Sequence, residues 1–450
     1  MSTGRLGSGG IPSDVTDVVA KSDFVGSRPP SGIQLEVQEL PTYKVGKRKR
    51  ASTLAIFFLT PPRWVLWIMR RLPFIPTLFR LPTIARYDHV AEALSRHDVF
   101  RVPFSSEMAR LSHPPGREGT PFILGLDDEE KHNHELKILM AAFKRSDIAD
   151  VVVPRSRSFA QERMKAASSV GHIDAVRELI TGVPLHLCTM YFGVDIPGNR
   201  QDFADALIDI SGHLFKRPPI KPSRAAVENR ASEYVLTIID RSIDNSHKHP
   251  ESVLARLMTA SARGELTRDD IRSFLIGMLT GFVPTNTIAG GHILETLFKR
   301  REFMAAACGA ARSGDDDLLK RCLFEALRFK PHNLGAFRNC TRDYTIGAGK
   351  PHSRRIKAGT TVLVSTLAAM FDSDRVREPA GFNPYRPASD YLYFGYGLHW
   401  CVGAFLAQAQ ITQTFKALLL KNKLQAAGKM KLRGTFPDAF VVTFDPVKPS

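Results

Sequence analysis

Apolar residues recur with a helical period through much of the middle of the chain. The clearest stretch is 268–283, where apolar side chains lie at offsets of 0, 3, 4, 7, 8 and 11 from Ile271. This spacing places them on one buried face of an α-helix. Pro284 interrupts the pattern, which resumes from Ile288 onward. Because a proline removes one backbone hydrogen bond and usually kinks a helix, we expect one long core helix that is broken at VPTN, residues 283–286.

Other segments carry weaker forms of the helical and strand patterns. Residues 81–100 predict a strand followed by an amphipathic helix, and a last strong helix is expected near Cys401. Further helices are predicted at about 125–149, 155–170, 200–215, 222–245 and 315–329, and short strands at about 337–346 and 360–364. The sequence therefore predicts a mainly helical fold of the α+β type with small β-sheets.

The start of the chain differs in composition from the rest. Residues 1–50 are rich in Gly, Ser and Pro, which predicts a flexible leader. Residues 51–81 hold the apolar runs LAIFFL and VLWIM after the basic tetrad KRKR, but prolines and arginines interrupt them. A spanning helix needs about 20 mainly apolar residues, so this segment is expected either to pack on the body or to lie on a membrane surface. Residues 82–450 are then expected to form a single domain.

The chain is basic, with 62 Lys and Arg against 45 Asp and Glu and a net charge of +17. Such a surface attracts acidic proteins, anionic lipid or nucleic acid. No basic run is interleaved with aromatic residues for base stacking, so nucleic acid is not expected. The five cysteines are irregularly spaced and form no CxxC pair, which argues for a reducing compartment. With no secretory signal pattern at the start, we expect a cytoplasmic protein, with or without peripheral membrane contact.

The segment FGYGLHWCVG, residues 394–403, carries the strongest chemical signal. Its glycines Gly395, Gly397 and Gly403 permit tight turns and close backbone approach. Cys401 stands where an apolar helix begins, and the amide N–H groups and helix dipole there favour a thiolate over a thiol. A buried free cysteine at a glycine-rich turn is the alternative.

The spacing of this segment resembles that of a known family. Phe394, Gly397, Cys401 and Gly403 fit FxxGxxxCxG, the haem loop of the cytochrome P450 superfamily, and the similarity covers about residues 82–440. The resemblance implies the cytochrome P450 fold and haem b (iron protoporphyrin IX), with Cys401 as the axial ligand of the iron. Thiolate ligation donates electron density to haem iron and favours O–O cleavage. The resemblance also implies that the haem contacts Phe394, Gly395 and Gly403.

A second motif agrees with the resemblance. Glu325 and Arg328 form the pattern ExxR, 76 residues before Cys401. The i, i+3 spacing puts both side chains on one helix face, where an ion pair can form, although such a pair alone is usually a surface pair. In the resembled family it locks the core beneath the haem together with an arginine from a later loop, and Arg386 in FNPYRP is the candidate for that role.

The resemblance also implies a set of residues around the haem propionates. Arg338 follows the ExxR helix at the position of a propionate-binding arginine, with a surface arginine as the alternative. His399 and His132 occupy positions of further propionate contacts. The arginine expected four residues after His132 is replaced by Leu136, so the adjacent Lys137 is the substitute candidate.

The long helix departs from the family at its expected break. Monooxygenase members carry an acid and then a threonine there, which relay protons to bound oxygen. In this chain Val283 and Pro284 fall at those positions, and neither can donate a proton. Thr285 and Asn286 follow as substitute catalytic candidates. A core asparagine bonded to the helix backbone is the alternative for Asn286.

Three functions remain open from these matches. The first and favoured one is a monooxygenase that inserts oxygen into a hydrophobic small molecule and takes its protons from water, Thr285 or the substrate. The second is a peroxygenase or fatty-acid hydroperoxide isomerase, which starts from a peroxide and uses the amide of Asn286 near the iron. The third is a haem-binding protein without catalysis, against which the complete Cys401 and ExxR motifs argue.

The substrate pocket is expected to be apolar, as small-molecule sites usually are. Its walls are predicted from Val102–Phe104, Phe282–Asn286 and Leu334–Phe337, above all from the side chains Phe104, Phe282, Val283, Leu334 and Phe337. No flavin- or ferredoxin-like segment is present, so electrons must come from another protein if they are used. The basic charge suits an acidic ferredoxin or flavodoxin, and a peroxide-driven enzyme needs no such donor.

Overall fold

The computed structural model describes residues 43, 61–71, 81–113, 119, 121–196, 198, 200–216 and 225–446. The chain divides into a unit of residues 1–40 and a unit of residues 41–450, and every described residue belongs to the second unit. The leader expected at 1–50 therefore lies outside the described residues apart from Tyr43, and so does most of the segment 51–81.

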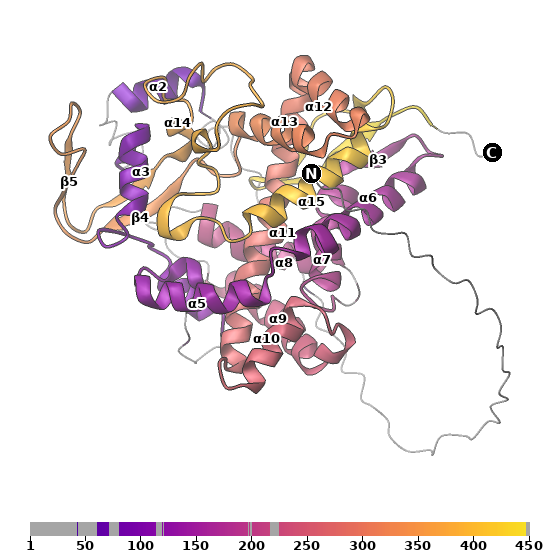
Figure 1. Ribbon diagram of the computed structural model, residues 1–450, viewed down its shortest axis with the longest axis horizontal. Coiled ribbons are helices and arrows are strands. Elements are labelled where there is room, and N and C mark those ends of the chain that lie inside the picture. The colour runs from indigo at the N-terminus through magenta and orange to yellow at the C-terminus, as the bar shows by residue number, and fades with distance from the viewer. Residues whose placement is uncertain are drawn as a thin grey trace, which may run out of the picture. The chain divides into compact units, whose positions relative to one another are not determined.

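Helices dominate the described residues (Figure 1). Those used below are α2 Arg63–Arg71, α3 Tyr87–Ser95, α4 Ser105–Leu111, α5 Glu129–Ala142, α6 Val153–Ala167, α7 Gly182–Met190, α8 Arg200–Lys216, α9 Ala225–Asp244, α10 Val253–Ala262, α11 Arg268–Lys299, α12 Arg301–Ser313, α13 Asp316–Phe329, α14 Thr366–Ala369 and α15 Ala404–Leu419. Together with the small sheets they confirm the predicted mainly helical fold of the α+β type.

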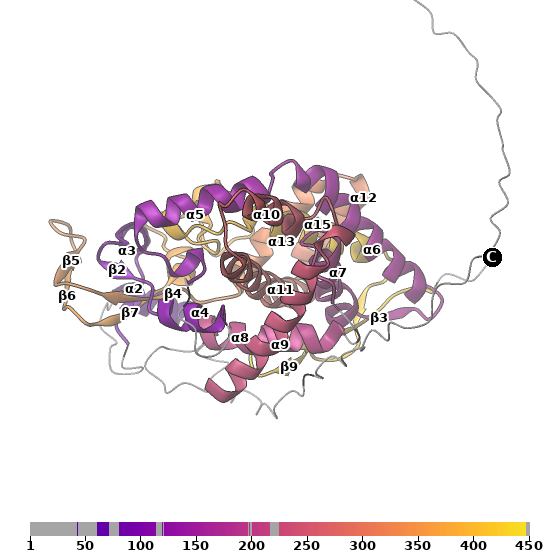
Figure 2. The ribbon, with the colours of Figure 1, turned by 90° about the horizontal axis from the view of Figure 1, so that it is seen from below.

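Helix α11 forms the centre of the helical body (Figure 2). Nearly all of its side chains between Ile271 and Leu297 are buried, and α7, α8, α9, α13 and α15 pack around it. A helix that is apolar on most sides belongs in a core. Its first turn is closed by a capping box, in which Asp270 N–H donates to Thr267 Oγ1 and Thr267 N–H donates to the Asp270 carboxylate.

The predicted break in α11 is wrong, because the helix continues without interruption through Pro284. The three residues after the proline each donate a side-chain hydrogen bond to the carbonyl four positions earlier. The bonds run from Thr285 to Gly281, from Asn286 to Phe282 (2.7 Å) and from Thr287 to Val283 (2.9 Å). These donors tie together the turn in which Pro284 lacks an N–H, and the surrounding helices hold it in place.

The strands form small sheets beside the helical body. The largest has the order β1-β7-β4-β2, in which β1 (Thr83–Ile84) is parallel to β7 (Thr361–Val364). Strand β4 (Ala336–Cys340) is antiparallel to β7 and to β2 (Phe100–Arg101). The smaller sheets contain β3 His172–Asp174, β8 Gln425–Ala426 and β11 Val441–Thr443, then β5 Tyr344–Ile346 with β6 Arg354–Ile356, and β9 Lys431–Arg433 with β10 Phe436–Ala439. Strand β4 carries Arg338 to the edge of the cavity described next.

Candidate active site

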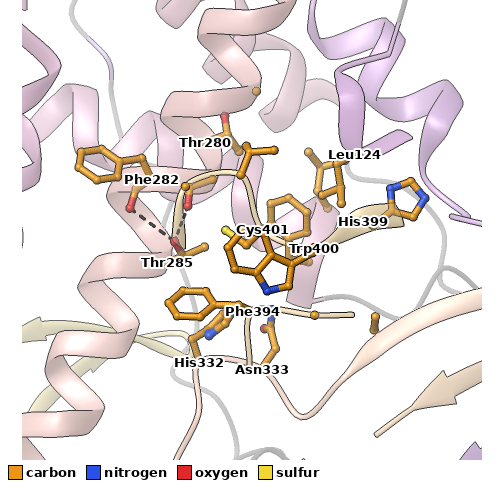
Figure 3. A pocket seen from close by; sticks show the side chains of 18 of the residues that line it. Leu124, Thr280, Phe282, Thr285, His332, Asn333, Phe394, His399, Trp400 and Cys401 are labelled. Atoms are coloured by element: carbon orange, nitrogen blue, oxygen red, sulfur yellow. Dashed lines mark hydrogen bonds between the residues drawn. The ribbon is translucent and has the colours of Figure 1, made fainter. Parts of the chain in front are cut away.

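A cavity of about 320 Å³ lies between α11, strand β4 and the loop that carries Cys401 (Figure 3). Most of its lining is apolar. The predicted site residues that line it are Phe104, His132, Phe282, Thr285, Asn286, Phe337, Arg338, Phe394, Gly395, His399, Cys401 and Gly403. The fold thus brings together side chains that are spread over about 300 residues of sequence, from Phe104 to Gly403.

Three of the predicted residues do not line the cavity. Lys137 is exposed, because five residues along α5 turn it about 140° away from His132. Val283 is fully buried in the core, about 100° around α11 from Phe282. Leu334 contributes its carbonyl to the start of α14, where it accepts from Leu367 N–H at 3.0 Å.

Other cavity residues were not predicted. His332 and Asn333 precede Leu334 and line the cavity in its place, and Leu406 and Ile411 do so from α15. Asp127, which bonds to His399, was missed as well. Asp127 and His399 are 272 residues apart, so no local spacing pattern could have paired them.

The loop before α15 presents Cys401 to the cavity. Cys401 N–H donates to the Phe394 carbonyl at 2.9 Å, which closes the loop on itself. Gly395 and Gly397 have φ values of +81° and +68°, in the left-handed region that favours glycine. A Cβ at Gly397 would also lie 2.8 Å from the Leu94 carbonyl oxygen. Two of the motif glycines are therefore required by the backbone of this turn.

The cysteine thiol does not ionise readily in the protein alone. Burial raises the pKa of Cys401 to about 11, and a backbone hydrogen bond from Gly403 lowers it only in part. In the protein alone, desolvation therefore outweighs the amide dipoles at the helix start. A metal ion would reverse this balance, since a coordinating thiol gives up its proton to the metal bond.

Arg338 supplies a buried cation on the cavity wall. Its guanidinium is 7% exposed, and burial lowers its pKa to about 10. Nη1 donates to the Phe337 carbonyl at 2.8 Å, and no carboxylate among the described residues forms an ion pair with it. A buried charge without a counterion is costly, so this position suits a carboxylate brought in by a ligand.

Two histidines lie near the same end of the cavity. The rings of His132 and His399 are 5.4 Å apart and meet edge to face. His399 Nε2 lies 3.0 Å from Asp127 Oδ1, which holds the ring in place. In the described part of the chain, Nδ1 of each ring is buried without a hydrogen-bond partner. Orphaned polar atoms beside Arg338 fit a group that carries carboxylates.

A fully buried ion-pair network lies on the side of the cavity where α13 packs against α15. Glu325 and Arg328 are both 0% exposed and form a bidentate pair, with bonds of 2.8 and 2.9 Å. Arg386 Nε donates to Glu325 Oε1 at 3.1 Å, and Tyr391 donates its hydroxyl proton to Oε2. Arg328 also donates to the carbonyls of Pro379 (2.8 Å) and Gly381 (3.1 Å). Asp390 Oδ2 lies 3.8 Å from Arg386 Nη1 and adds a second carboxylate, so each charge of the network is paired and this region is rigid.

The opposite wall is formed by α11. In Figure 3, Thr285 projects from this helix toward the loop that carries Cys401 and Phe394. The Thr285 hydroxyl donates to the Gly281 carbonyl, which leaves its oxygen able to accept a hydrogen bond from the cavity. The Asn286 amide is bonded at both ends within the protein, to the Phe282 carbonyl and to Gln410. This geometry fits the structural interpretation of Asn286 better than the catalytic one.

The residues present fit a planar metal-bearing group with carboxylates. Cys401 offers one soft ligand, Arg338 and His132 offer donors at one end, and the remaining walls are apolar. Among the described residues no group of three or more His, Cys, Asp or Glu side chains could hold a bare metal ion. The cavity therefore suits a metal that arrives inside an organic cofactor.

Comparison with known proteins agrees with this geometry. The family model described as Cytochrome P450 matches residues 81–448. The chain is 24% identical over 341 residues to cyclomarin C epoxidase of Salinispora arenicola, covering 74% of this chain and 81% of the relative. It is 26% identical over 312 residues to erythromycin C-12 hydroxylase of Saccharopolyspora erythraea, covering 68% and 74%. Cytochrome P450 CYP109Q5 from Chondromyces apiculatus has a similar structure, with a TM-score of 0.69 and 23% identity over 87% of this chain and 97% of that one.

Proposed function

The chain belongs to the cytochrome P450 family, whose enzymes are oxidoreductases with haem b as cofactor, and from this premise we propose that it inserts oxygen into a hydrophobic small molecule. The observation that carries the proposal is the apolar cavity of about 320 Å³ beside Cys401. Phe104 and Phe337 stack edge to face at 6.5 Å on its wall, and Phe282 adds a third ring from α11. Such a wall selects apolar substrates through burial rather than through charge.

In this proposal Cys401 holds the haem iron, and Arg338 with His132 holds the propionates. The bound haem supplies the iron centre at which an O–O bond is activated and cleaved. On the protein side, Thr285 lines the cavity and can accept a proton at its hydroxyl oxygen, because its own proton is donated to the Gly281 carbonyl. Phe282 and Phe337 exclude water from the substrate side.

Oxidation driven by peroxide is the second candidate. Val283 and Pro284 carry no exchangeable side-chain proton, and Val283 faces the core. Proton delivery to dioxygen is then expected to be inefficient, whereas a peroxide already carries the required protons and electrons. The oxidant of this candidate is either hydrogen peroxide or a fatty-acid hydroperoxide. The enzymatic relatives favour either oxidation over a haem-binding protein without catalysis.

The decisive experiment compares two ways of supplying oxidant to the haem-loaded protein. Fatty acids, terpenes and aromatic compounds are each incubated with a ferredoxin and reductase plus dioxygen, or with hydrogen peroxide or an organic hydroperoxide. We expect oxygenated product in both arms, with much uncoupled electron consumption in the first. Tight coupling without peroxide activity would rule out the second candidate, and no product in either arm would contradict the proposal itself.

We further propose that an acidic ferredoxin or flavodoxin binds beside the Cys401 loop. Trp400 is 42% exposed, and its ring lies 5.7 Å from that of the half-exposed Phe405. The Arg145 guanidinium stacks on the Phe405 ring at 3.8 Å, which adds a cation to the aromatic pair. Arg145→Glu should raise the KM for the acidic donor and weaken its salt dependence. Peroxide-driven turnover of the same variant should not change, because no donor protein takes part.

We also propose that α2 contacts an anionic membrane surface. No described helix is long and apolar enough to cross a bilayer. Trp64 and Trp67 are 62% and 52% exposed, with Arg71 stacked on Trp67 at 5.3 Å, whereas Arg70 anchors the helix through the Ala368 carbonyl at 2.9 Å. Indole rings beside arginines suit the headgroup region of anionic lipid.

Vesicle sedimentation tests this contact. The protein should sediment with vesicles that contain phosphatidylserine, and the double variant Trp64→Ala with Trp67→Ala should not. Trp400→Ala is the matched control, because it removes the third tryptophan of the chain, which is exposed in the Cys401 loop and not in α2. Equal sedimentation of all three proteins would contradict the contact.

A further inference from the structure

Asn286 and Gln410 connect the helix on one side of the cavity to the helix that follows Cys401. Gln410 Nε2 donates to Asn286 Oδ1 at 2.8 Å, and Asn286 Nδ2 donates to the Phe282 carbonyl at 2.7 Å. The two residues are 3% and 1% exposed. Asn286 lies in α11 two residues after Pro284, and Gln410 lies in α15 nine residues after Cys401. One buried contact therefore spans the two elements that enclose the haem site.

The far end of this contact is fixed as well. The Thr414 hydroxyl donates to the Gln410 backbone carbonyl at 2.7 Å and lies 3.5 Å from its side-chain oxygen. Ala407 and Ile411, on either side of Gln410, line the cavity, but Gln410 itself does not. Any effect of Gln410 on the reaction must therefore pass through Asn286 or through the position of α11.

We propose that Asn286 and Gln410 form a brace that positions the Pro284 turn of α11, and with it Thr285, relative to Cys401. Pro284 leaves this turn one backbone hydrogen bond short, between Phe282 and Thr285, which both line the cavity. The Asn286–Gln410 hydrogen bond holds this turn in place by joining it to α15, where a backbone hydrogen bond within α11 is missing. Asn286 is then a positioning residue and does not act on the reacting oxygen. The turnover measurement described below rests on the proposed oxygen insertion, whereas the ligand-binding measurement does not.

A double-mutant cycle separates positioning from direct action. The variants are Gln410→Leu, Asn286→Ala and the two combined, all loaded with haem. Thr287→Val is the matched control, because Thr287 also donates to a carbonyl of the same turn but bonds to Thr181 (3.1 Å) instead of α15. The first measurement is imidazole binding to the haem iron, followed by the absorption spectrum, which needs no substrate.

We expect Gln410→Leu, Asn286→Ala and the double variant to bind imidazole more tightly by a similar factor, about threefold or more, because a released turn yields to the incoming ligand. Thr287→Val should bind it as the wild type does. Product formed per electron should fall in the same three variants by about 10-fold or more, since small displacements of a positioning group strongly reduce turnover. The exchanged pair Asn286→Gln with Gln410→Asn should recover both measurements in part.

The opposite pattern would overturn the brace. If Asn286 acts directly, Asn286→Ala should lower the peroxide-driven rate by about 100- to 1000-fold while Gln410→Leu leaves both that rate and imidazole binding unchanged. Equal effects of Thr287→Val would also count against it. Should Gln410→Leu hold no haem, Gln410→Met keeps the length of the side chain without the donated hydrogen bond and is held to the same criteria. If the wild type gives no product with any oxidant, the proposed function is contradicted. Imidazole binding still tests whether Asn286 and Gln410 position the turn.

Discussion

The two sides of the cavity are held in place by different kinds of interaction. The proximal wall, formed by the Cys401 loop and the Glu325 network, rests on buried charges that are fully paired. The distal wall, formed by α11 around Pro284, rests on neutral bonds from side chains to backbone carbonyls and on the single amide pair Asn286–Gln410. The segment that leads into the Cys401 loop is thus tied to α13 by charged bonds, and the substrate side is held by neutral ones.

The difference has a physical consequence for how each wall tolerates change. Removing one partner of a buried ion pair leaves an uncompensated charge and costs about 3–5 kcal/mol. Leaving a neutral buried amide unsatisfied costs about 1–3 kcal/mol. A protein with this fold can therefore accept substitutions in the distal wall and still fold, whereas a substitution in the ion-pair network of the proximal wall leaves a charge unpaired. Val283 and Pro284, which replace the expected acid and threonine, lie in the distal wall.

The largest expected effect is the loss of Cys401. Cys401→Ser should abolish the thiolate-type band of the reduced carbon-monoxide complex, because serine offers no soft ligand to the iron. Replacing the other cysteines one at a time should leave the band intact, namely Cys188, Cys308, Cys322 and Cys340. A thiolate band that survives in Cys401→Ser would show that another residue holds the iron.

The next effect tests the proximal network directly. Glu325→Ala leaves Arg328 and Arg386 without their shared carboxylate and should cost about 3–5 kcal/mol of folding free energy. We expect little haem-loaded protein, measured as the ratio of Soret to protein absorbance. Glu265→Ala is the control, because its pair with Arg263 is about half exposed and should contribute little. Normal haem content with loss of turnover alone would mean that Glu325 is catalytic.

A smaller effect separates folding from cofactor binding at Arg338. The guanidinium is buried with no carboxylate in direct contact among the described residues, and Asp127 attracts it only from a distance, so Arg338→Met should leave the apoprotein as stable as the wild type or raise its thermal midpoint. The same variant should release haem about 10- to 100-fold faster, because it loses a charge-assisted bond to a propionate. Transfer of haem to apomyoglobin measures the rate, and Arg342→Met at an exposed pair is the control. Unchanged haem release would remove Arg338 from the site.

Contacts between residues close in the sequence could be predicted, and contacts between distant residues could not. Glu325 and Arg328 are three residues apart on one helix, so their pairing was predictable, and the structure brings them together with Arg386. The Gly395 and Gly397 turns also follow from local geometry. Contacts such as Gln410 with Asn286, 124 residues apart, leave no periodic trace in the sequence.

The errors have equally local causes. Lys137 adjoins the position at which the resemblance implies an arginine, but neighbouring residues of a helix point about 100° apart. The break expected at Pro284 did not allow for three side-chain donors that follow it and for the helices packed around α11. The thiolate expected from a helix start did not allow for the burial of Cys401. At Pro284 and Cys401, tertiary packing outweighed a correct local tendency.

The smallest expected effect tests the distal wall. Val283→Asp with Pro284→Thr restores the acid and hydroxyl that monooxygenase relatives carry, and Pro284→Thr also returns one backbone N–H to α11. We expect product per electron to rise about 2- to 5-fold with reductase and dioxygen, a modest gain because Val283 lies in the core and a carboxylate there is poorly solvated. Val283→Asn with Pro284→Thr matches the size without the charge and should gain less. If the carboxylate variant does not fold, Pro284→Thr alone should still improve coupling through its hydroxyl. No gain in any of these variants would mean that Thr285 or a water chain already delivers protons. The distal wall would then be held by weaker bonds than the proximal wall but would not limit proton delivery.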